Sequence, residues 1–578
     1  MSVITVENLR YRYPHAKELA LDGLDFSVEK GEFIGIIGEN GAGKSTLSQA
    51  IMGLVPQFYK GAYGGTVMVD GIEAGRTPVA QLCGHVGLVF QNPFNQLSGA
   101  KDNVYEEVAF GMQNLGVPAE EMKGRVEEAL KLLDIWQYRD RNPFDLSGGQ
   151  MQRVAIASVL VMRPDVMILD EPTSQLDPEG SDEVFKAVET LTGSGITILM
   201  IEQKIEKLAA YCDRILLLHR GKQIAFDTPQ KVFSMPDLNN YGIQAPAFTR
   251  ICKAEGVTLA DGTYPVTVEE AAGVLKEKRL GAPACADGKE RAQRAAGAEL
   301  AQAGGPTESA GSSDEQFCIE NLDFSYLADV PVLKNLNMKL DKRPTAIIGQ
   351  NGAGKTTLVK LLKGLLKPVS GSICFHGEDI SGKTVAMLAG NVGYVFQNPD
   401  DQIFKYNVMD EILFGPLNIG MDAERAKKEA ERALELTGLT GKEKENPYDL
   451  ELYERKMTAI ASVLAMDTDV LILDEPTIAQ DWKGRQIIGG IIRSLSERGK
   501  LVIAILHDMD FVAENFERVI IMAHGQVLAD GTAKEVFAQE EALKKARLQK
   551  PYVMQLCEAL GYEKSYLTVE ELLKDQVS

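Results

Sequence analysis

Two glycine-rich stretches, GENGAGKS at Gly38–Ser45 and GQNGAGKT at Gly349–Thr356, decide the fold of this chain. Both fit the pattern G-x-x-x-x-G-K-[ST], and each follows an apolar, strand-like run and precedes a helical stretch. The glycines let successive backbone N–H groups turn toward one anion at the start of a helix. The pattern therefore predicts two phosphate-binding loops of the P-loop type.

The last two residues of each loop have separate predicted roles. Lys44 and Lys355 are expected to reach the β- and γ-phosphates of a nucleotide, while Ser45 and Thr356 offer hydroxyl groups to Mg²⁺. With the threonine that follows each loop, the predicted nucleotide-contacting residues are Gly38, Glu39, Asn40, Gly41, Ala42, Gly43, Lys44, Ser45, Thr46, Gly349, Gln350, Asn351, Gly352, Ala353, Gly354, Lys355, Thr356 and Thr357.

The chain is a tandem repeat of two long units. Residues 145–233 align without a gap on residues 449–537 at a constant offset of about 304 residues. A period of this length indicates duplicated domains rather than a solenoid of short repeats. Between the copies, residues 281–316 are rich in Ala, Gly and Ser and poor in large apolar side chains, which predicts a flexible linker. The predicted divisions are domains at 1–235 and 317–540, each with a C-terminal extension, at 236–280 and 541–578.

Composition limits the class of protein. The residues are 45% hydrophobic and 25% charged, as in globular proteins. A chain of 578 residues is too long to fold around one hydrophobic core, so two or more domains are expected. No stretch approaches the ~18–20 apolar residues of a membrane helix, and the N-terminus lacks the apolar region of a signal peptide. Seven scattered cysteines without a CxxC pair predict reduced thiols in a cytosolic protein. A net charge of −21 would repel nucleic-acid phosphates, so no nucleic-acid partner is expected.

Each copy has the pattern of an α/β domain with a carboxylate pair at one strand end. Apolar runs alternate with longer helical stretches, which favours a largely parallel sheet. One such run in each copy, VMILDE or VLILDE, ends in adjacent acids. Asp170 and Asp474 suit Mg²⁺, which prefers oxygen ligands, while Glu171 and Glu475 are placed to orient or deprotonate an attacking water.

These motifs resemble those of ATP-binding cassette (ABC) ATPases over nearly all of the chain outside the linker. The resemblance implies ATP and Mg²⁺ as ligands and, in each copy, a mainly parallel sheet core with an antiparallel β subdomain and a helical subdomain. It also implies a signature motif, LSGGQ, at Leu146–Gln150. By position it assigns catalytic roles to Gln91, Gln397 and His507, and the two glutamines would also contact the metal. It assigns adenine stacking to Tyr13 and Tyr326.

Cassettes of this family resemble one another in pairing head to tail, so each ATP would lie between the P-loop of one copy and the signature of the other. Lys355 should then face LSGGQ, where Ser147 and the amides of Gly148 and Gly149 would donate hydrogen bonds to the γ-phosphate, and Gln150 is a further predicted ATP-binding residue. Lys44 should face Leu450–Glu454, where the signature reads LELYE and Glu451 replaces the serine.

A second departure from the family pattern falls in the same predicted site. The gap-free alignment places Gln203 at the position of His507, and glutamine cannot become a cation. Head-to-tail pairing would bring Gln203 and LELYE to one ATP, which predicts one hydrolysing site and one site that turns ATP over slowly or not at all. Glu171, retained in the altered site, leaves slow turnover open.

The segments after Gln91 and Gln397 resemble those of the ATPases of energy-coupling-factor (ECF) importers for vitamins or metal ions. This resemblance implies a transmembrane scaffold protein and a small membrane-embedded substrate-binding protein as partners, and a peripheral position on the cytoplasmic face of the membrane. Two alternatives stay open: a fused ATPase of a sugar importer, and a soluble twin-cassette ATPase that acts on ribosomes.

Overall fold

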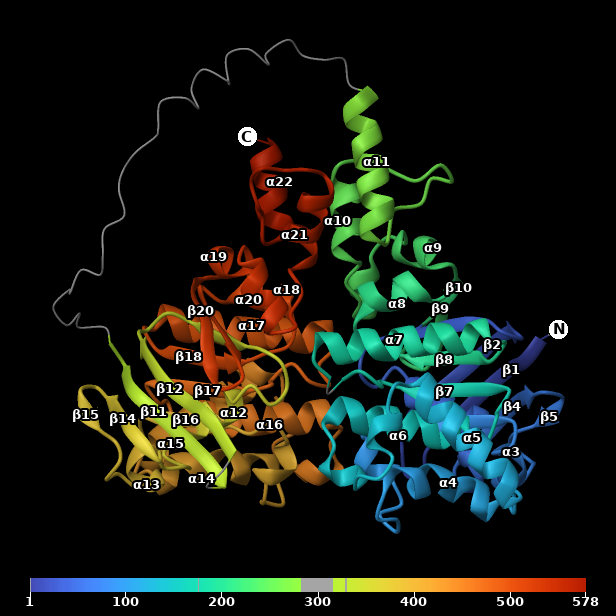
Figure 1. Cartoon of the computed structure of the whole chain (residues 1–578), viewed down its shortest axis with the longest axis horizontal. Coiled ribbons are helices and arrows are strands. Elements are labelled where there is room, and N and C mark those ends of the chain that lie inside the picture. Colours follow the sequence, from blue (N-terminus) through green and yellow to red (C-terminus); the bar gives the residue numbers. More distant parts are fainter. Residues whose placement is uncertain (1, 175, 282–314, 328–329, 578) are drawn as a thin grey trace.

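The computed structural model describes residues 2–174, 176–281, 315–327 and 330–577. These residues form two similar cassettes that lie side by side, with a pair of helical extensions projecting from one face (Figure 1). Apart from residues 281, 315 and 316, the predicted linker at 281–316 lies outside the described residues. The prediction of two tandem α/β P-loop domains is confirmed.

Each cassette contains two sheets. In the first cassette an antiparallel sheet has the order β2-β1-β4-β5, and a mainly parallel sheet has the order β10-β9-β3-β8-β7-β6. Its strands are β1 (Ser2–Arg12), β2 (Leu21–Glu29), β3 (Phe33–Ile37), β4 (Ala62–Val69), β5 (Ile72–Glu73), β6 (Val86–Val89), β7 (Val166–Asp170), β8 (Thr197–Ile201), β9 (Arg214–His219) and β10 (Lys222–Asp227). Strands β3, β7 and β8 are almost wholly apolar because helices and the other sheet cover both faces.

The second cassette repeats this topology, with sheets β12-β11-β14-β15 and β16-β17-β18-β13-β19-β20. Its strands are β11 (Phe317–Leu327), β12 (Val330–Leu340), β13 (Thr345–Ile348), β14 (Ser370–Phe375), β15 (Glu378–Asp379), β16 (Val392–Val395), β17 (Val470–Asp474), β18 (Leu501–Ile505), β19 (Arg518–Ala523) and β20 (Gln526–Thr532). Because parallel strands end at one sheet edge, β13 and β17 deliver the P-loop and the carboxylate pair to the same place.

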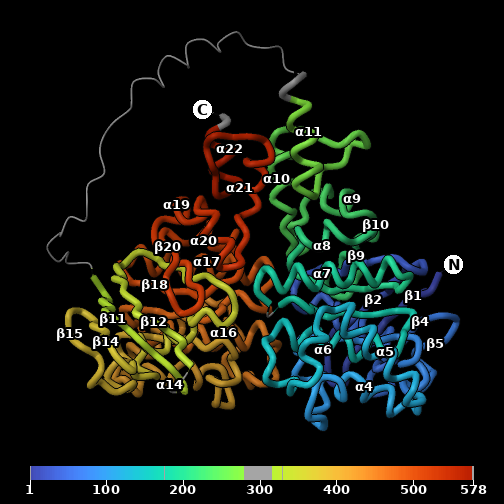
Figure 2. Tube along the Cα trace, viewed as in Figure 1, coloured from blue at the N-terminus to red at the C-terminus, as the bar shows by residue number. Residues whose placement is uncertain are grey.

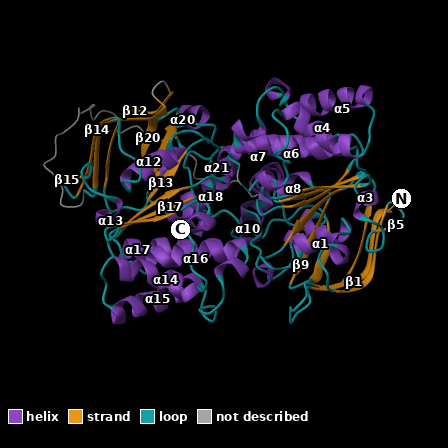
Figure 3. Ribbon diagram, turned by 90° about the horizontal axis from the view of Figure 1, so that it is seen from below, coloured by secondary structure: helices purple, strands orange, loops and turns teal. Residues whose placement is uncertain are grey.

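Helices cover the sheets and form a separate layer in each cassette. Those of the first half are α1 (Lys44–Ile51), α2 (Leu54–Gln57), α3 (Val79–Leu82), α4 (Val104–Asn114), α5 (Ala119–Leu132), α6 (Gly148–Leu160), α7 (Pro178–Gly193), α8 (Ile205–Tyr211), α9 (Pro229–Phe233), α10 (Ala247–Ala254) and α11 (Val268–Gly281). Those of the second are α12 (Lys355–Leu362), α13 (Val385–Leu388), α14 (Val408–Asn418), α15 (Ala423–Thr437), α16 (Leu452–Leu464), α17 (Trp482–Glu497), α18 (Met509–Asn515), α19 (Ala533–Phe537), α20 (Glu540–Lys545), α21 (Tyr552–Ala559) and α22 (Val569–Val577). Seen from below, the α4–α6 and α14–α16 layers lie on opposite sides, in a head-to-tail arrangement (Figure 3).

The two C-terminal extensions share one hydrophobic core. Helices α10 and α11 follow the first cassette, α21 and α22 follow the second, and the four lie together in the tube view (Figure 2). The buried residues of this core are Ala247, Phe248, Ile251, Cys252, Ala271, Ala272, Leu275, Val553, Leu556, Cys557, Tyr566, Val569 and Leu572. The rings of Phe248 and Tyr552 meet edge to face across it, with centroids 5.6 Å apart. The extensions therefore join the two halves through a hydrophobic core of their own.

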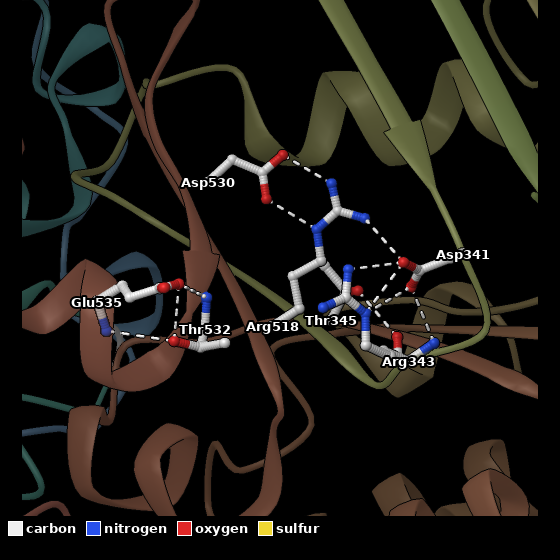
Figure 4. Close-up of polar contacts among 7 residues, drawn as sticks. All are labelled: Asp341, Arg343, Thr345, Arg518, Asp530, Thr532 and Glu535. Atoms are coloured by element: carbon white, nitrogen blue, oxygen red, sulfur yellow. Dashed lines mark hydrogen bonds and ion pairs between the residues drawn. The ribbon is translucent and has the colours of Figure 1, made fainter. Parts of the chain in front are cut away.

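An ion cluster fastens the outer strands of the second cassette (Figure 4). Arg518, which begins β19, holds Asp530 of β20 through two hydrogen bonds of 2.7 and 2.6 Å. Asp341, just after β12, accepts from Arg343 and lies 3.9 Å from Arg518. Paired arginine–carboxylate hydrogen bonds fix geometry as well as charge. The cluster thus ties the antiparallel sheet to the edge of the parallel sheet.

Candidate active sites

The P-loop lysines are buried at the starts of α1 and α12. Lys44 and Lys355 are 7% and 5% exposed, and each Nζ donates to a carbonyl inside its own loop, Gly38 O at 2.8 Å or Gly349 O at 2.7 Å. Burial lowers the pKa of Lys355, while Glu475, Asp177 and Asp474 oppose that effect. A buried cation surrounded by backbone N–H groups is suited to binding phosphate.

The loops need glycine because backbone lies against them. A Cβ atom on Gly38 would come within 2.4 Å of Leu218 O, and one on Gly349 within 2.1 Å of Met522 O. The residues that precede the lysines, Gly43 and Gly354, have φ values of 99° and 97°, in the left-handed region that favours glycine.

In the second cassette two side chains hold the Glu475 carboxylate from both sides. Gln397 Nε2 donates to Oε2 at 2.8 Å, and His507 Nε2 lies 2.9 Å from Oε1. Burial acts to raise the pKa of Glu475, but His507, Lys355 and Lys456 outweigh it, so the pKa lies below its ordinary value. Glu475, at 7% exposed, is therefore a buried carboxylate held in its charged form.

The adjacent Asp474 fits the predicted metal site. Thr356 Oγ1 donates to its Oδ1 at 3.4 Å, and Tyr394 OH donates to its Oδ2 at 2.9 Å. In the first cassette Ser45 likewise hydrogen-bonds to Asp170. A hydroxyl and a carboxylate beside a phosphate-binding loop are the oxygen ligands that Mg²⁺ prefers, so the residues fit the ion.

In the first cassette the corresponding carboxylate has neutral partners on both sides. Gln91 Nε2 donates to Glu171 Oε2 at 2.7 Å, and Gln203 Nε2 donates to Oε1 at 2.7 Å, the place that His507 takes in the other half. Burial raises the pKa of Glu171 to about 7, with Asp170 and Glu202 adding to the rise and Lys44 opposing it. The two glutamates thus lie in the same geometry but in opposite electrostatic environments.

Three further residues, which sequence analysis missed, widen this difference. Tyr394 and Lys456 hydrogen-bond to Asp474, and the charge of Glu202 acts on Asp170 and Glu171. Their counterparts in the other copy are Leu88, Gln152 and Leu506. These unlike pairs were visible in the alignment of the two copies, although they lie outside the family motifs.

The two charged residues among these three, Lys456 and Glu202, lie in different cassettes. Lys456, only 2% exposed, bonds the carbonyl oxygens of Gln397 and Asp474, the latter at 3.4 Å, so it ties the Gln397 segment to β17. Burial lowers the pKa of Lys456 to about 8. Glu202, 3% exposed, accepts from Thr173 Oγ1 at 2.6 Å in the first cassette. A buried cation is therefore added to one site and a buried anion to the other.

Each P-loop contacts the opposite cassette, as the head-to-tail arrangement requires. The backbone N–H of Asn40 donates to Asp481 Oδ2 at 2.9 Å, and that of Asn351 donates to Asp177 Oδ2 at 3.1 Å. Both aspartates follow the carboxylate strands and cap the helices α17 and α7.

The two signature segments start the equivalent helices α6 and α16. Ser147 and Gln150 form a capping box at the start of α6, and a Cβ on Gly149 would lie 3.5 Å from Leu176, next to the Asp177 that contacts the second P-loop. At α16 the Glu451 Oε1 atom would lie 3.8 Å from a Cβ on Gly41 of the first P-loop. Burial raises the pKa of Glu451 and Lys44 opposes the rise. The carboxyl group of Glu451 thus stands where the other interface has the hydroxyl of Ser147.

The two candidate adenine-stacking tyrosines lie beside the P-loops. Tyr13 OH lies 3.2 Å from Thr46 Oγ1, and Tyr326 OH lies 3.3 Å from Thr357 Oγ1. The Tyr13 ring packs edge-on against Tyr11 at 4.8 Å, whereas Tyr326 is 58% exposed. Both threonines directly follow the loops, so the tyrosines border the two P-loops.

The fold and the two P-loops define a P-loop ATPase with two cassettes in one chain, and each P-loop contacts the opposite cassette. The family model for "ABC transporter" matches residues 21–174 and 333–478. The chain belongs to the ABC transporter family of ATP-binding proteins and is an ATPase.

Known proteins resemble the whole chain or one half of it. A protein of Caldanaerobacter subterraneus subsp. tengcongensis, described as an ABC transporter ATP-binding protein, is 38% identical over 99% of this chain and 98% of its own. CbiO1 of Clostridium perfringens, titled part of the ABC transporter complex CbiONQ, is 36% identical over 40% of this chain and 94% of its own, with a TM-score of 0.36. An archaeal ribosome recycling factor, aABCE1, covers 91% of this chain and 90% of its own at 20% identity and a TM-score of 0.57, a similarity of fold alone.

Proposed function

We propose that this chain hydrolyses ATP at one composite site and holds ATP at the other. The observation that carries the proposal is the arrangement around Glu475, which is held by His507 and Gln397 and lies near Lys355, whose P-loop contacts Asp177 of the other half. The other composite site combines Gln203 with Glu451, so it lacks both the histidine and the signature serine.

In the proposed reaction Glu475 accepts a proton from the water that attacks the γ-phosphate. His507 and Gln397 fix both carboxylate oxygens, so the base does not have to be oriented during the reaction. Lys355 and the P-loop N–H groups bind the phosphates, and Thr356, Asp474 and Gln397 would hold Mg²⁺. When bound, Mg²⁺ would neutralise charge on the β- and γ-phosphates. Ser147 and the amides of Gly148 and Gly149 would approach the γ-phosphate from the opposite half.

At the other site Lys44 and its loop retain the means to bind ATP. Ser45, Asp170 and Gln91 supply the same metal-binding groups as in the second cassette. Glu451, however, brings an anion toward the phosphates where the other interface offers a hydroxyl donor, and Gln203 supplies an amide instead of an imidazole. These two changes support retention of ATP with slow turnover or none.

Separate substitutions of the two glutamates test this assignment. With the membrane partner present, Glu475→Gln is expected to abolish ATP turnover, while Glu171→Gln leaves most of it. Steady-state phosphate release would measure both. Equal losses in the two variants would contradict the one-site model.

We further propose that the chain energises an importer of the ECF type for a vitamin or a metal ion. Within the described residues no helix is both long and apolar enough to cross a bilayer, and ATP-binding subunits of this family generally work with transmembrane partners. The likeness of the segments after Gln91 and Gln397 to ECF ATPases supports a scaffold protein and a small membrane-embedded substrate-binding protein as partners. The chain would then lie on the cytoplasmic face of the membrane.

Exposed aromatic side chains mark the face on which the scaffold would dock. They lie near the segments after the two glutamines and along α14: Phe90, Phe94, Phe144, Phe404, Tyr406, Phe414 and Tyr448, between 39% and 83% exposed. Helices α4 and α14 lie at the end of the molecule opposite the C-terminal extensions (Figure 1). Exposed aromatic patches of this kind mark interaction surfaces.

Partner capture separates this proposal from the two alternatives. An ECF ATPase would co-purify from membranes with a scaffold and a small hydrophobic protein. A fused ATPase of a sugar importer would be recovered with membrane subunits served by a separate binding protein, and a ribosome-directed twin cassette would sediment with ribosomes. Either of these outcomes would overturn the ECF assignment.

A further inference from the structure

The first P-loop contains a carboxylate that bridges the two cassettes. Glu39, the second residue of GENGAGKS, has a side chain that is 13% exposed. Its Oε2 accepts from Lys483 Nζ of the second cassette at 2.7 Å, and its Oε1 lies 2.7 Å from His219 Nδ1 of its own cassette. Lys483 is in the first turn of α17, two residues after the Asp481 that binds the backbone of Asn40.

The surroundings of Glu39 restrict it to this position. The ring of Tyr241 packs edge-on against His219, with centroids 5.4 Å apart. Gly242 has φ +73°, and a Cβ there would lie 2.7 Å from the Glu39 Cβ. Backbone therefore closes over the carboxylate on one side while the lysine of the other half holds it from across the interface.

The equivalent positions of the other interface have different chemistry. Gln350 replaces Glu39, Ala523 replaces His219, and Glu179 replaces Lys483. Glu179 instead pairs with Arg547 of the second C-terminal extension at 2.6 Å. A neutral glutamine facing the segment of an acidic residue cannot form the ion pair seen at Glu39. The bridge is thus specific to the interface on the Lys44 side.

We propose that Glu39 and Lys483 form an ionic latch that keeps the Lys44 interface closed while the Lys355 interface opens and closes. Glu39 acts as a positioning residue: it holds the first P-loop against α17. With only half of Lys483 exposed and Glu39 largely buried, the pair is less screened than a surface ion pair. The latch concerns interface closure and does not depend on the transported cargo or on which site hydrolyses ATP.

Hydrogen–deuterium exchange of the full chain with bound Mg²⁺ and ADP tests the latch. In the wild type, peptides covering 38–45 should exchange more slowly than those covering 349–356. Lys483→Met should speed exchange of the first loop by roughly three- to tenfold, the range for a partly buried ion pair, and leave the second loop unchanged. Lys483→Arg, which keeps the cation, should retain protection.

Two further variants keep the result interpretable. Arg547→Met breaks the Arg547–Glu179 pair of the other half and should not alter exchange of peptide 38–45. Combining Glu39→Gln with Lys483→Met should add little to the effect of Lys483→Met alone, because both substitutions remove the same ion pair. Unchanged exchange of the first loop in Lys483→Met, or equal acceleration of both loops with an unchanged melting temperature, would overturn the proposal.

Discussion

The Nε2 atom of His507 lies 2.9 Å from Oε1 of Glu475, so an imidazole fixes the carboxylate of the second cassette at the point where an amide of Gln203 fixes Glu171 in the first. The distances are alike, and the difference is chemical. An imidazole can carry positive charge and a glutamine amide cannot. The effect of having histidine at one site and glutamine at the other can be measured with single substitutions.

His507→Gln should give Glu475 the same kind of partner that Gln203 provides for Glu171. The amide can hold Glu475 in place, so ATP binding should change little. Losing a preorganised group near the transition state should lower kcat by about 10²–10³-fold. Steady-state ATPase assays would measure kcat and KM separately. A loss confined to KM would show that His507 serves binding only.

Restoring ATP turnover at the Lys44 site is expected to require both the signature residues and the histidine that this site lacks. In a chain inactivated by Glu475→Gln, replacing residues 451–453 by Ser-Gly-Gly removes the Glu451 anion, and Gln203→His restores the imidazole. Either change alone should give little turnover, and the combination should give at least tenfold more than either, because the groups act on one phosphate. Single-turnover phosphate release would measure it. Full activity from the signature repair alone would make Gln203 an adequate substitute for histidine.

Lys456→Gln should slow the reaction without unfolding the cassette. Lys456 bonds the carbonyl oxygens of Gln397 and Asp474, so its loss should loosen the Gln397 segment. We expect kcat to fall by about tenfold, in line with loss of roughly one charge-assisted hydrogen bond, with a smaller change in KM for ATP. Gln152, the counterpart in the first cassette, gives a matched control: Gln152→Lys should leave turnover at the second site intact. An unaltered kcat in Lys456→Gln would make the buried lysine purely structural.

Asp510→Asn should stabilise the junction between the second cassette and its extension at neutral pH. Asp510 accepts from the Tyr552 N–H at 2.9 Å. Burial raises the pKa of Asp510 well above its ordinary value, with Asp508 and Glu206 adding to the rise and Arg485 opposing it. The folded state therefore binds this proton more tightly than the unfolded state, and the stability falls as the pH rises above about 4.

The Asp510→Asn variant keeps an oxygen that can accept the Tyr552 hydrogen bond, but its side chain cannot ionise. Its melting temperature should exceed that of the wild type at pH 8, by ~2–4 °C for each kcal/mol gained, and the gap should narrow at pH 6. Thermal unfolding at both pH values measures this difference. A variant less stable than the wild type at both would show that the buried carboxylate charge is favourable at this junction.

Local pattern was enough to predict the α/β fold and to find the P-loops and carboxylate strands, because these motifs depend on short runs of sequence. The opposing positions of Lys44 and LELYE followed from resemblance, and the contact of Asn40 with Asp481 agrees with that arrangement. Tyr394, Lys456 and Glu202 were not predicted because their effect depends on where a side chain reaches after packing. The shared core of the extensions was missed for the same reason, since its two halves lie about 300 residues apart.

The shared core of α10, α11, α21 and α22 has a kinetic consequence. Whichever nucleotide interface separates, the two cassettes remain fastened at this second point. Each half then meets the other at an effective concentration in the millimolar range, roughly that of short tethers. Reclosure is therefore a first-order event, and its rate should be the same in a crowded membrane and in a dilute preparation.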